Sequence, residues 1–495
     1  MRRNHFMTVL GVAWLPSLAL AKSVPKIYVN HFYPNVTSQA LQDDITTEGL
    51  MGNLAELYQI ALDNDGNRAF GLPGYEASGD FIWSRISGSD RVIASKQDFP
   101  GLFNDVTSIT LTVNDEDYYV YGLTYSPSTS EEGMTAEMVF GPTGEAGCAV
   151  DGYEGYDVEG KIVLAERGPC PDGTTLSGRV RPAAAAGAVG IIIYNSSPGN
   201  VTAGTLVAPD PDFVPAGFIN MDDGEALRSR LAAGEELTAH FQQTQLIETR
   251  ISQNFLAETK AGDPNNVIML GAHLDSVKAG PGINDDGSGT SLILELFTAL
   301  EKYNIKNKVR FAWWGAEENG LVGSTFYTDN LNTTQADKIL AYLNFDMVSR
   351  GYFGVFDGDG STHGLVGPPG SGVIEELFVE DLTSKGIEVT PAEFSGGSDY
   401  ATFMENLEIA VGGLHTGTGI EQDPCYHQPC DTYDNVNATV LTINAKAAAH
   451  VLATLAMVGD ELIPKSNSTS ERSAMPVAWT QFEDQRHVFG CGHEI

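Results

Sequence analysis

Residues 267 to 296 contain the first side chains whose types and spacing could do chemistry. An apolar run leads to His273 and Asp275. A loop rich in Gly and Pro then leads to Asp285 and Asp286, and an apolar pattern with helical spacing follows. This order predicts a strand, a loop and a helix, and such loops collect ligands in α/β sheets because their backbone is free of ladder hydrogen bonds. The imidazole and carboxylate groups in this loop predict a metal site.

Four further candidate ligands occur later in the chain, near the ends of apolar segments. They are Glu317, Glu318, Asp346 and His427. A single His or Asp near a strand end is more often a hydrogen-bonded loop residue than a metal ligand. Their joint occurrence favours a metal site, because carboxylates beside a hydrophobic core are costly to bury without a partner.

The segments that must position these side chains follow an α/β pattern. Apolar segments that predict strands cover residues 267–270, 309–314 and 340–346. Helical spacing covers residues 45–62, with a start at Thr46 or Thr47, and an alanine-rich helical tract covers residues 437–457. Because the strands alternate with helices, we expect a three-layer α/β/α sandwich with a mixed, mostly parallel central sheet.

The pattern changes between residues 126 and 245. Short β-like segments alternate there with Gly, Pro and Asp turns, and residues 179–188 form a helix-compatible tract of small side chains. We interpret this tract as a β-rich module inserted into the α/β domain, with continuation of the main sheet as the alternative. The α/β domain then consists of residues 22–125 and 246–460, and residues 461–495 form a tail.

The composition and the N-terminus limit the classes of function. The chain has 28 Lys and Arg against 65 Asp and Glu, a formal charge of -37, which opposes binding to nucleic acid and to anionic membranes. Residues 1–21 combine two arginines, an apolar stretch and an Ala-Leu-Ala ending, and therefore predict a secretory signal peptide rather than a buried helix. No later segment has the ~18 uninterrupted apolar residues of a membrane helix. We expect a secreted, soluble protein.

Cysteines and glycosylation sequons agree with this location. In an oxidising compartment we pair Cys425 with Cys430 and Cys148 with Cys170, because each pair brackets one short segment. Cys491 is left over, either unpaired or on a tail that is removed. Sequons that permit glycosylation stand at Asn35, Asn195, Asn200, Asn332, Asn437 and Asn467.

Two groups of motifs carry resemblances to known families. The segments GAHLDSV, GPGINDDGSG, WWGAEENGLVGS, NFDMVS, FSGGSDYATF and CYHQPCDTYDN resemble the co-catalytic dizinc aminopeptidases, the family of aminopeptidase Y and leucyl aminopeptidases, over residues 249–457. The segments GYDVEGKIVLAERGPC, RPAAAAGAVGIIIYNSS and VPAGFINMDDGEALRSRL resemble the protease-associated domain, which is inserted in several secreted or vacuolar peptidases.

The first resemblance implies a site for two zinc ions (Zn²⁺). It makes Asp285 the carboxylate that bridges both ions. His273 and Asp346 complete one zinc site, and Glu318 and His427 complete the other. Asp275 then supports His273, and we expect its carboxylate to accept the free ring N–H of that imidazole. We expect Asp286 to be the acid at the N-terminus of the following helix.

The resemblance also assigns the catalytic groups. Glu317 is expected to be the general base that takes a proton from the metal-activated water and returns it to the leaving amine. Tyr426 is expected to donate a hydrogen bond to the oxyanion of the reaction. The bridge between Cys425 and Cys430 would clamp the loop that carries Tyr426 and His427.

The implied activity is removal of an apolar N-terminal residue, such as Leu, from peptides with a free N-terminus. Gly397 departs from relatives that carry a basic residue there, which puts a side-chain clamp on the substrate in doubt. We expect a monomer that is secreted or vacuolar, with no nucleic-acid or membrane partner. The alternatives are a carboxypeptidase, a glutaminyl cyclase with one zinc, and a receptor ectodomain that lacks metals. The complete ligand set argues against the receptor, and the CYHQPCD context argues against the two enzymes.

Overall fold

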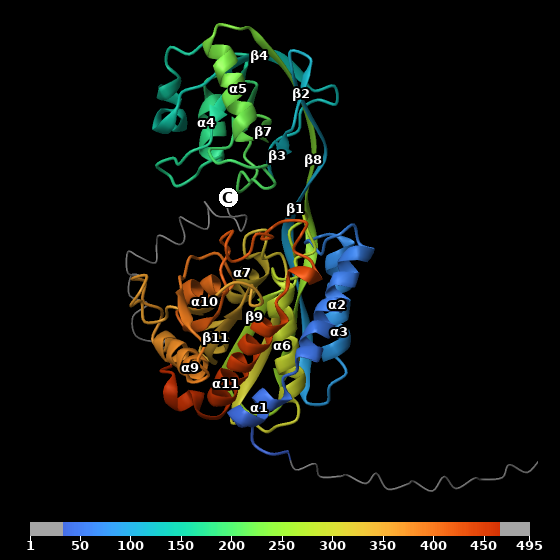
Figure 1. Cartoon of the computed structure of the whole chain (residues 1–495), viewed down its shortest axis with the longest axis vertical. Coiled ribbons are helices and arrows are strands. Elements are labelled where there is room, and N and C mark those ends of the chain that lie inside the picture. The colour runs from blue at the N-terminus through green and yellow to red at the C-terminus, as the bar shows by residue number, and fades with distance from the viewer. Residues whose placement is uncertain (1–32, 466–495) are drawn as a thin grey trace, which may run out of the picture.

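The computed structural model describes residues 33–465, which form two stacked parts joined by a long two-stranded ribbon (Figure 1). The signal peptide at residues 1–21, the sequon at Asn467, Cys491 and all but the first residues of the tail lie outside the described residues. The lower part in Figure 1 contains β9, α6 and β11, the elements next to the candidate metal ligands, and the upper part is the inserted tract.

The lower part is built on a mixed sheet whose central strands are parallel. The strand order from one edge is β13, β12, β14, β11, β9, β10, β8. The bounds are β8 Leu237–Thr259, β9 Asp263–His273, β10 Asn307–Trp314, β11 Ile339–Phe345, β12 Phe353–Phe356, β13 Val389–Ala392 and β14 Ala410–Leu414. Strands β9, β10, β11 and β14 are parallel, while β8 pairs antiparallel with β10. The three predicted strands therefore exist.

Helices cover both faces of this sheet. One face packs against α1 Ser38–Asp44, α2 Thr47–Asp63, α3 Pro73–Ile86, α6 Gly287–Leu300, α9 Ser371–Ser384 and α11 Ala438–Leu462. The other face packs against α7 Val322–Asp329 and α10 Tyr400–Asn406, and a short helix, α8 Thr333–Ala336, lies before β11. The expected three-layer α/β/α sandwich is confirmed.

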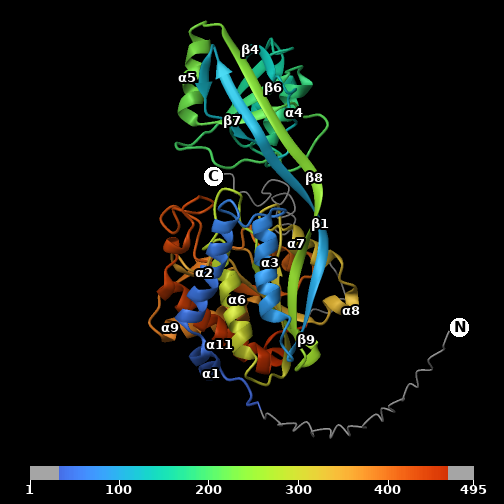
Figure 2. The same cartoon turned by 90° about the vertical axis from the view of Figure 1, so that its right-hand side faces the viewer.

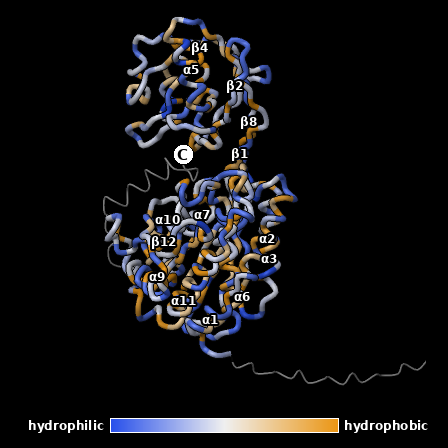
Figure 3. Tube along the Cα trace, viewed as in Figure 1, coloured by the Kyte–Doolittle hydropathy of each residue, from blue (hydrophilic) through white to orange (hydrophobic). Residues whose placement is uncertain are grey.

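Helices α2 and α11 match the predicted helices closely. The hydroxyl of Thr46 accepts a hydrogen bond from the Gly49 N–H and caps α2, which buries Leu50, Leu54 and Leu57. Helix α11 is long and apolar enough to cross a membrane, but 67% of its most apolar window is buried within the protein. Figure 3 shows hydrophobic residues along α11 in the lower part, and many of them, such as Leu441, Val451 and Leu455, are buried. It is therefore the central core helix of this part.

Two long antiparallel strands, β1 Val92–Val113 and β8, run from the lower part into the upper part (Figure 2). The sequence has strand-like patterns at residues 108–113 and 118–123, which predict two short strands here, and it predicts a module boundary at residue 245. In the structure that boundary lies inside β8, because one strand serves both parts. The half-exposed middle of the ribbon has no continuous apolar run, so hydrophobic patterning gives no signal for it.

The upper part is a small α/β unit that extends the same sheet. Its strands are β2 Glu116–Tyr118, β3 Tyr121–Gly122, β4 Met134–Phe140, β5 Ile162–Glu166, β6 Gly190–Tyr194 and β7 Ala216–Ile219. One face packs against α4 Ser177–Ala185 and the other against α5 Met221–Ala232. Because β4 pairs with β8, both interpretations of this tract are partly right: it has its own cores, and it continues the main sheet.

The expected disulfides are confirmed, and one sequon is unfavourably placed. Cys148 pairs with Cys170, and Cys425 pairs with Cys430. Among the described sequons, the exposed ones are Asn35, Asn200, Asn332 and Asn437. Asn195 is buried, and its Oδ1 accepts a hydrogen bond from Arg167, so glycosylation at Asn195 is not supported.

Candidate metal centre and active site

The predicted site residues meet at the carboxyl ends of the central strands. His273 ends β9, Asp346 directly follows β11, and Glu317 and Glu318 follow β10 by a few residues. A pocket of about 240 Å³ is lined by all of the proposed ligands and catalytic groups, which are His273, Asp285, Glu317, Glu318, Asp346, Tyr426 and His427. Parallel strands bring their carboxyl ends to one edge of the sheet, which explains why residues so far apart in sequence converge.

Asp285 lies at the centre of this group. Its Oδ1 is 3.1 Å from Nε2 of His273, and its Oδ2 is 3.1 Å from Nε2 of His427. The two oxygens of one carboxylate thus face two different imidazoles. This arrangement can serve two neighbouring cations with a single side chain.

The remaining acids divide between the two imidazoles. On one side, Nε2 of His273 lies 3.7 Å from Oδ1 of Asp346 and 3.9 Å from Oε2 of Glu317. On the other side, Nε2 of His427 lies 3.1 Å from Oε2 of Glu318. Both Glu317 and Glu318 are therefore close enough to the imidazoles to reach a metal bound there.

The N-terminus of α6 fixes Asp285 in place. Asp286 caps this helix, because its Oδ1 accepts a hydrogen bond from the Gly289 N–H, as expected for an acid at a helix start. The same oxygen accepts from the Met347 N–H, which ties α6 to the end of β11. A Cβ at Gly289 would lie 2.0 Å from the carbonyl oxygen of Phe345, so only glycine permits this close approach.

Asp275 supports the site in a different way from the expected one. The carboxylate was expected to accept the ring N–H of His273, but its Oδ1 lies 3.8 Å from Nδ1, beyond hydrogen-bond distance. The backbone carbonyl of Asp275 is the group 3.1 Å from Nδ1. The carboxylate instead accepts the backbone N–H groups of Glu317 and Glu318, at 3.1 and 3.2 Å. Asp275 therefore positions both glutamates as well as the imidazole.

Several supporting residues are not identified by the sequence reasoning. Asp431 accepts the backbone N–H groups of Asn284 and Asp285, and the hydroxyl of Ser398 donates to Oδ2 of Asp346. Arg68 is buried and donates to carbonyls of the loop before Asp285. The position of Asp431 directly after Cys430 was a usable signal for it, whereas Arg68 lies more than 200 residues away and had none.

The electrostatics of the cluster are those of acids that lack enough positive charge. Burial raises the pKa of Glu317 well above its usual value and that of Glu318 to about 7. Burial lowers the pKa of His427, but the carboxylates of Glu318 and Asp285 outweigh it and raise that pKa to about 10. Bound cations would relieve this excess of negative charge.

The donor set fits zinc. Two imidazoles and three or more carboxylates are the nitrogen and oxygen ligands that zinc takes in catalytic sites. Oε1 of Glu318 is buried without a hydrogen-bond partner among the described residues. The residues present therefore match a zinc centre in type and in placement.

The loop that carries His427 is held on two sides. The disulfide between Cys425 and Cys430 closes the loop around Tyr426 and His427. The ring of Tyr426 stacks on the imidazole of His427 with centroids 3.9 Å apart. The Gln428 side chain donates to the hydroxyl of Thr202, a 3.0 Å contact that joins this loop to the upper part.

Comparison with known proteins places this arrangement in a family. Residues 254–452 match the model of peptidase family M28, and residues 134–227 match that of the PA domain. Leucine aminopeptidase 2 of Trichophyton rubrum is 37% identical over 483 residues, which cover 93% of each sequence. The chain belongs to peptidase family M28. An aminopeptidase of Pseudomonas aeruginosa is also 37% identical to this M28 member, over 90% of this chain and 88% of the other.

Solved structures of aminopeptidases share the fold. An aminopeptidase from Aneurinibacillus sp. strain AM-1 superposes with a TM-score of 0.71 at 26% identity, covering 88% of this chain and 99% of the other. A zinc aminopeptidase from Bacillus subtilis has a TM-score of 0.66 at 24% identity, with 82% and 94% covered. The resemblances to the family of aminopeptidase Y and leucyl aminopeptidases and to the protease-associated domain are confirmed, and the comparisons support a zinc aminopeptidase of family M28 as the coarse assignment.

Proposed function

We propose that the protein is a secreted aminopeptidase that uses two zinc ions to remove an apolar residue, Leu or a similar one, from the N-terminus of peptides. The observation that carries this proposal is the central carboxylate of Asp285, whose two oxygens each lie 3.1 Å from a different imidazole. A single carboxylate in that position serves two metal sites at once. The proposed state is a monomer, released to the exterior or to a vacuole.

His273 and Asp346 would hold one zinc ion, Glu318 and His427 the other, and Asp285 both. When bound, a pair of zinc ions supplies an activated water and polarises the scissile carbonyl. The side chains of His273, Asp285 and His427 are buried, and charge interactions between buried groups are stronger than those in water.

Glu317 is the proposed general base. Its carboxylate lies in the pocket wall, is buried, and takes the proton of the attacking water before handing it to the leaving amine. Its backbone N–H and that of Glu318 both donate to the carboxylate of Asp275, which fixes the backbone that carries the two glutamates. Tyr426, which also lines the pocket, would donate its phenolic O–H to the oxyanion that forms on the substrate carbonyl.

The pocket also favours a particular substrate. Its acids would attract the free α-amine of a peptide, which an acylated N-terminus lacks. Aromatic rings of Tyr352, Phe356 and Tyr400 line the same pocket and suit an apolar first side chain. Gly397 lines the pocket without a side chain, so recognition of the substrate main chain would rest on other groups.

The other readings are less well supported. A receptor ectodomain of this fold has no need for a complete ligand set around a pocket. A carboxypeptidase needs a cationic group for the substrate carboxylate, and among the pocket-lining residues none is Lys or Arg. A glutaminyl cyclase with one zinc would leave half of the cluster around Asp285 without a role.

The test is hydrolysis of a leucyl amide by the purified protein. Activity should fall to background after treatment with a chelator and return with Zn²⁺. A panel of aminoacyl amides would measure the preference for apolar first residues. The control is the same leucyl substrate with an acetylated N-terminus, and equal hydrolysis of the two would exclude an exopeptidase.

A further inference from the structure

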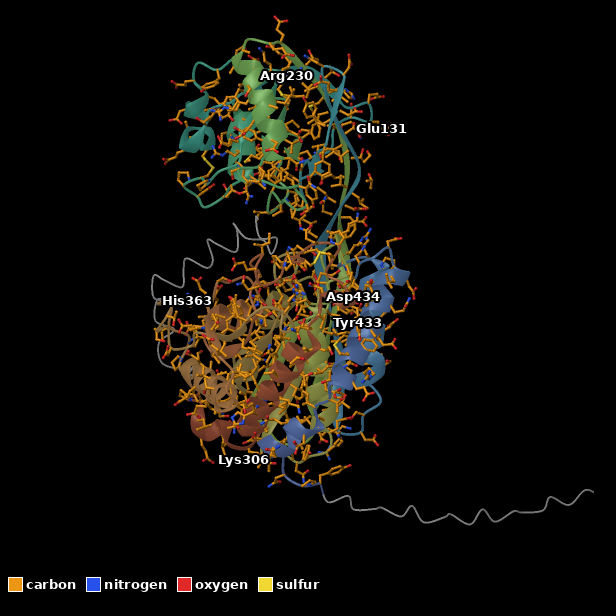
Figure 4. All side chains as sticks on the ribbon, viewed as in Figure 1. Glu131, Arg230, Lys306, His363, Tyr433 and Asp434 are labelled. Atoms are coloured by element: carbon orange, nitrogen blue, oxygen red, sulfur yellow. A yellow bond between two sulfur atoms is a disulfide. The ribbon has the colours of Figure 1, made fainter. Side chains whose placement is uncertain are left out.

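A second cluster of carboxylates lies outside the proposed zinc centre. Asp357, Asp359 and Glu375 each offer an oxygen, and these three atoms lie within 4.8 Å of one another. The two aspartates belong to the segment Asp-Gly-Asp-Gly-Ser, which follows β12 directly, and Glu375 belongs to the second turn of α9. Figure 4 labels His363, which lies on the same loop between β12 and α9, at the outer edge of the lower part.

Asp357 is the buried member of this cluster, with 1% of its surface exposed. Its Oδ2 accepts hydrogen bonds from the backbone N–H groups of Thr362 and His363, at 3.0 and 2.6 Å. Its Oδ1 is buried and has no hydrogen-bond partner among the described residues. A buried carboxylate oxygen without a partner is destabilising, because it has lost its hydrogen bonds to water, so a ligand at this atom is expected.

The cluster has no cation of its own. Within residues 33–465, no Lys, Arg or His side chain forms an ion pair with any of the three acids. The Asp359 N–H donates to Oε2 of Glu375 at 2.9 Å, which is the direct link between the loop and α9. Burial raises the pKa of Glu375, and the neighbouring carboxylates of Asp359 and Asp357 add to the rise. Three converging acids need either a shared proton or a bound cation.

We propose that Asp357, Asp359 and Glu375 bind one calcium ion (Ca²⁺). All three ligands are carboxylate oxygens on an irregular loop and a helix, which suits a hard cation with flexible coordination. Zinc prefers nitrogen or sulfur donors, which this cluster lacks. Two oxygens that bind Ca²⁺ from opposite sides at about 2.4 Å lie about 4.8 Å apart, so the observed spacing accommodates one ion.

The ion would brace one wall of the substrate pocket. Phe356 precedes Asp357 and lines the pocket. Its ring stacks on Phe394 with centroids 5.0 Å apart and packs on Tyr400 at 4.8 Å. Bound Ca²⁺ would link the end of β12 to α9. Because Asp357 would be a ligand of the ion, the adjacent residue Phe356 would become less mobile.

The experiment uses the full, zinc-loaded protein in calcium-free buffer, titrated with CaCl₂. We expect one Ca²⁺ bound per chain by equilibrium dialysis, beyond the zinc already present. At a concentration of about 100 times Kd, Tm should rise by about 3 °C. Asp359→Asn should weaken binding at least about tenfold and remove the rise in Tm. In calcium-free buffer this exposed substitution should leave Tm close to that of the wild type, because asparagine keeps the side-chain oxygen that accepts from the Ser361 N–H.

The matched control is Glu376→Gln, an exposed acid beside Glu375 on α9. This variant should keep the full rise in Tm, which separates the cluster from general binding to a protein of charge -37. The proposal is overturned if CaCl₂ leaves the wild-type Tm unchanged, or if Asp359→Asn keeps the whole effect. A Tm that rises only on acidification, with no response to CaCl₂, would assign a shared proton to the cluster instead.

Discussion

Neighbouring residues in this site have different surroundings, and those surroundings decide their proposed roles. Glu317 and Glu318 are adjacent in sequence and share Asp275 as the acceptor of their backbone N–H groups. Only Glu318 contacts His427, at 3.1 Å, whereas Glu317 lies nearest to His273, at 3.9 Å. The shorter contact makes Glu318 the better ligand and leaves Glu317 for proton transfer.

Glu317→Gln should reduce kcat by about 10²–10⁴-fold, because the amide cannot accept the proton of the attacking water. The zinc content of the variant should stay that of the wild type, since the amide fills the same volume. Steady-state kinetics and metal analysis of the same sample measure both. Loss of zinc in this variant would instead make Glu317 a ligand and Glu318 the base.

Asp285→Asn should empty both metal sites, because one carboxylate contacts both imidazoles. Asp346→Asn is the matched variant, since Asp346 lies near His273 alone. We expect metal analysis to find almost no zinc in Asp285→Asn and about one zinc ion per chain in Asp346→Asn. Equal zinc contents in the two variants would contradict the bridging role of Asp285.

At the scale of single elements, pairs of strands and short loops hold the site in register. Glu258 on β8 stands opposite Arg310 on β10, and its carboxylate also contacts Lys308, whose Nζ is 3.1 Å away. This cluster joins the ribbon to the central sheet. The loop of residues 425–430 performs the same task for Tyr426 and His427.

The carboxylate of Glu258 should stabilise the protein only above acidic pH. Burial raises its pKa, but the cations of Arg310 and Lys308 outweigh this and lower it below 4.5. The contribution is therefore complete above about pH 4.5 and fades as the pH falls through the lowered pKa. Glu258→Gln should reduce the free energy of unfolding by about 2 kcal/mol at pH 7. Urea unfolding at several pH values should show the two proteins converging in acid, and a difference that persists there would contradict the charge interaction.

Removal of the disulfide in the active-site loop should impair activity more than its effect on stability suggests. A bridge that closes so short a loop stabilises by about 2 kcal/mol through chain entropy. Replacing Cys425 and Cys430 with Ser should also reduce kcat/KM about 10–100-fold, because His427 and Tyr426 lose their fixed position. The same replacement of Cys148 and Cys170 is the control, and it should leave kcat/KM unchanged. Equal losses in the two double variants would exclude a positioning role.

At the scale of the whole molecule, the proposed metals join segments that are distant in sequence. Their ligands extend from His273 to His427 and come from strand ends, a helix start and a loop. The upper part reaches this region through the ribbon and through the hydrogen bond between Thr202 and Gln428. Metal loading should therefore affect the stability of the entire lower part.

Removal of zinc by a chelator should lower Tm by about 5 °C or more, because ions that bind only the folded state stabilise it by mass action. Addition of Zn²⁺ should restore Tm and activity together. Differential scanning calorimetry with and without the chelator measures the change. An unchanged Tm in protein that has lost its zinc would show that the ions do not link these segments.

The sequence by itself determined the fold class, the disulfide pairs and the set of candidate ligands. Alternating apolar segments predict the central strands, and the spacing of Cys425 and Cys430 limits their pairing to one short loop. The ligand types are readable because imidazoles and carboxylates beside apolar segments stand out locally. Each of these predictions rests on residues that are close together in the sequence. It can therefore be made without the tertiary structure.

Only the tertiary structure decided how these residues are supported. The contacts of Asp431 and Arg68 with the loop around Asp285, and the carboxylate contacts of Asp275, depend on close packing between distant segments. The long ribbon through both parts has no local pattern, because its middle is exposed on both faces. The hydrogen-bond partners and the exposure of a side chain depend on how distant segments pack together. The order of residue types along the sequence therefore does not predict them.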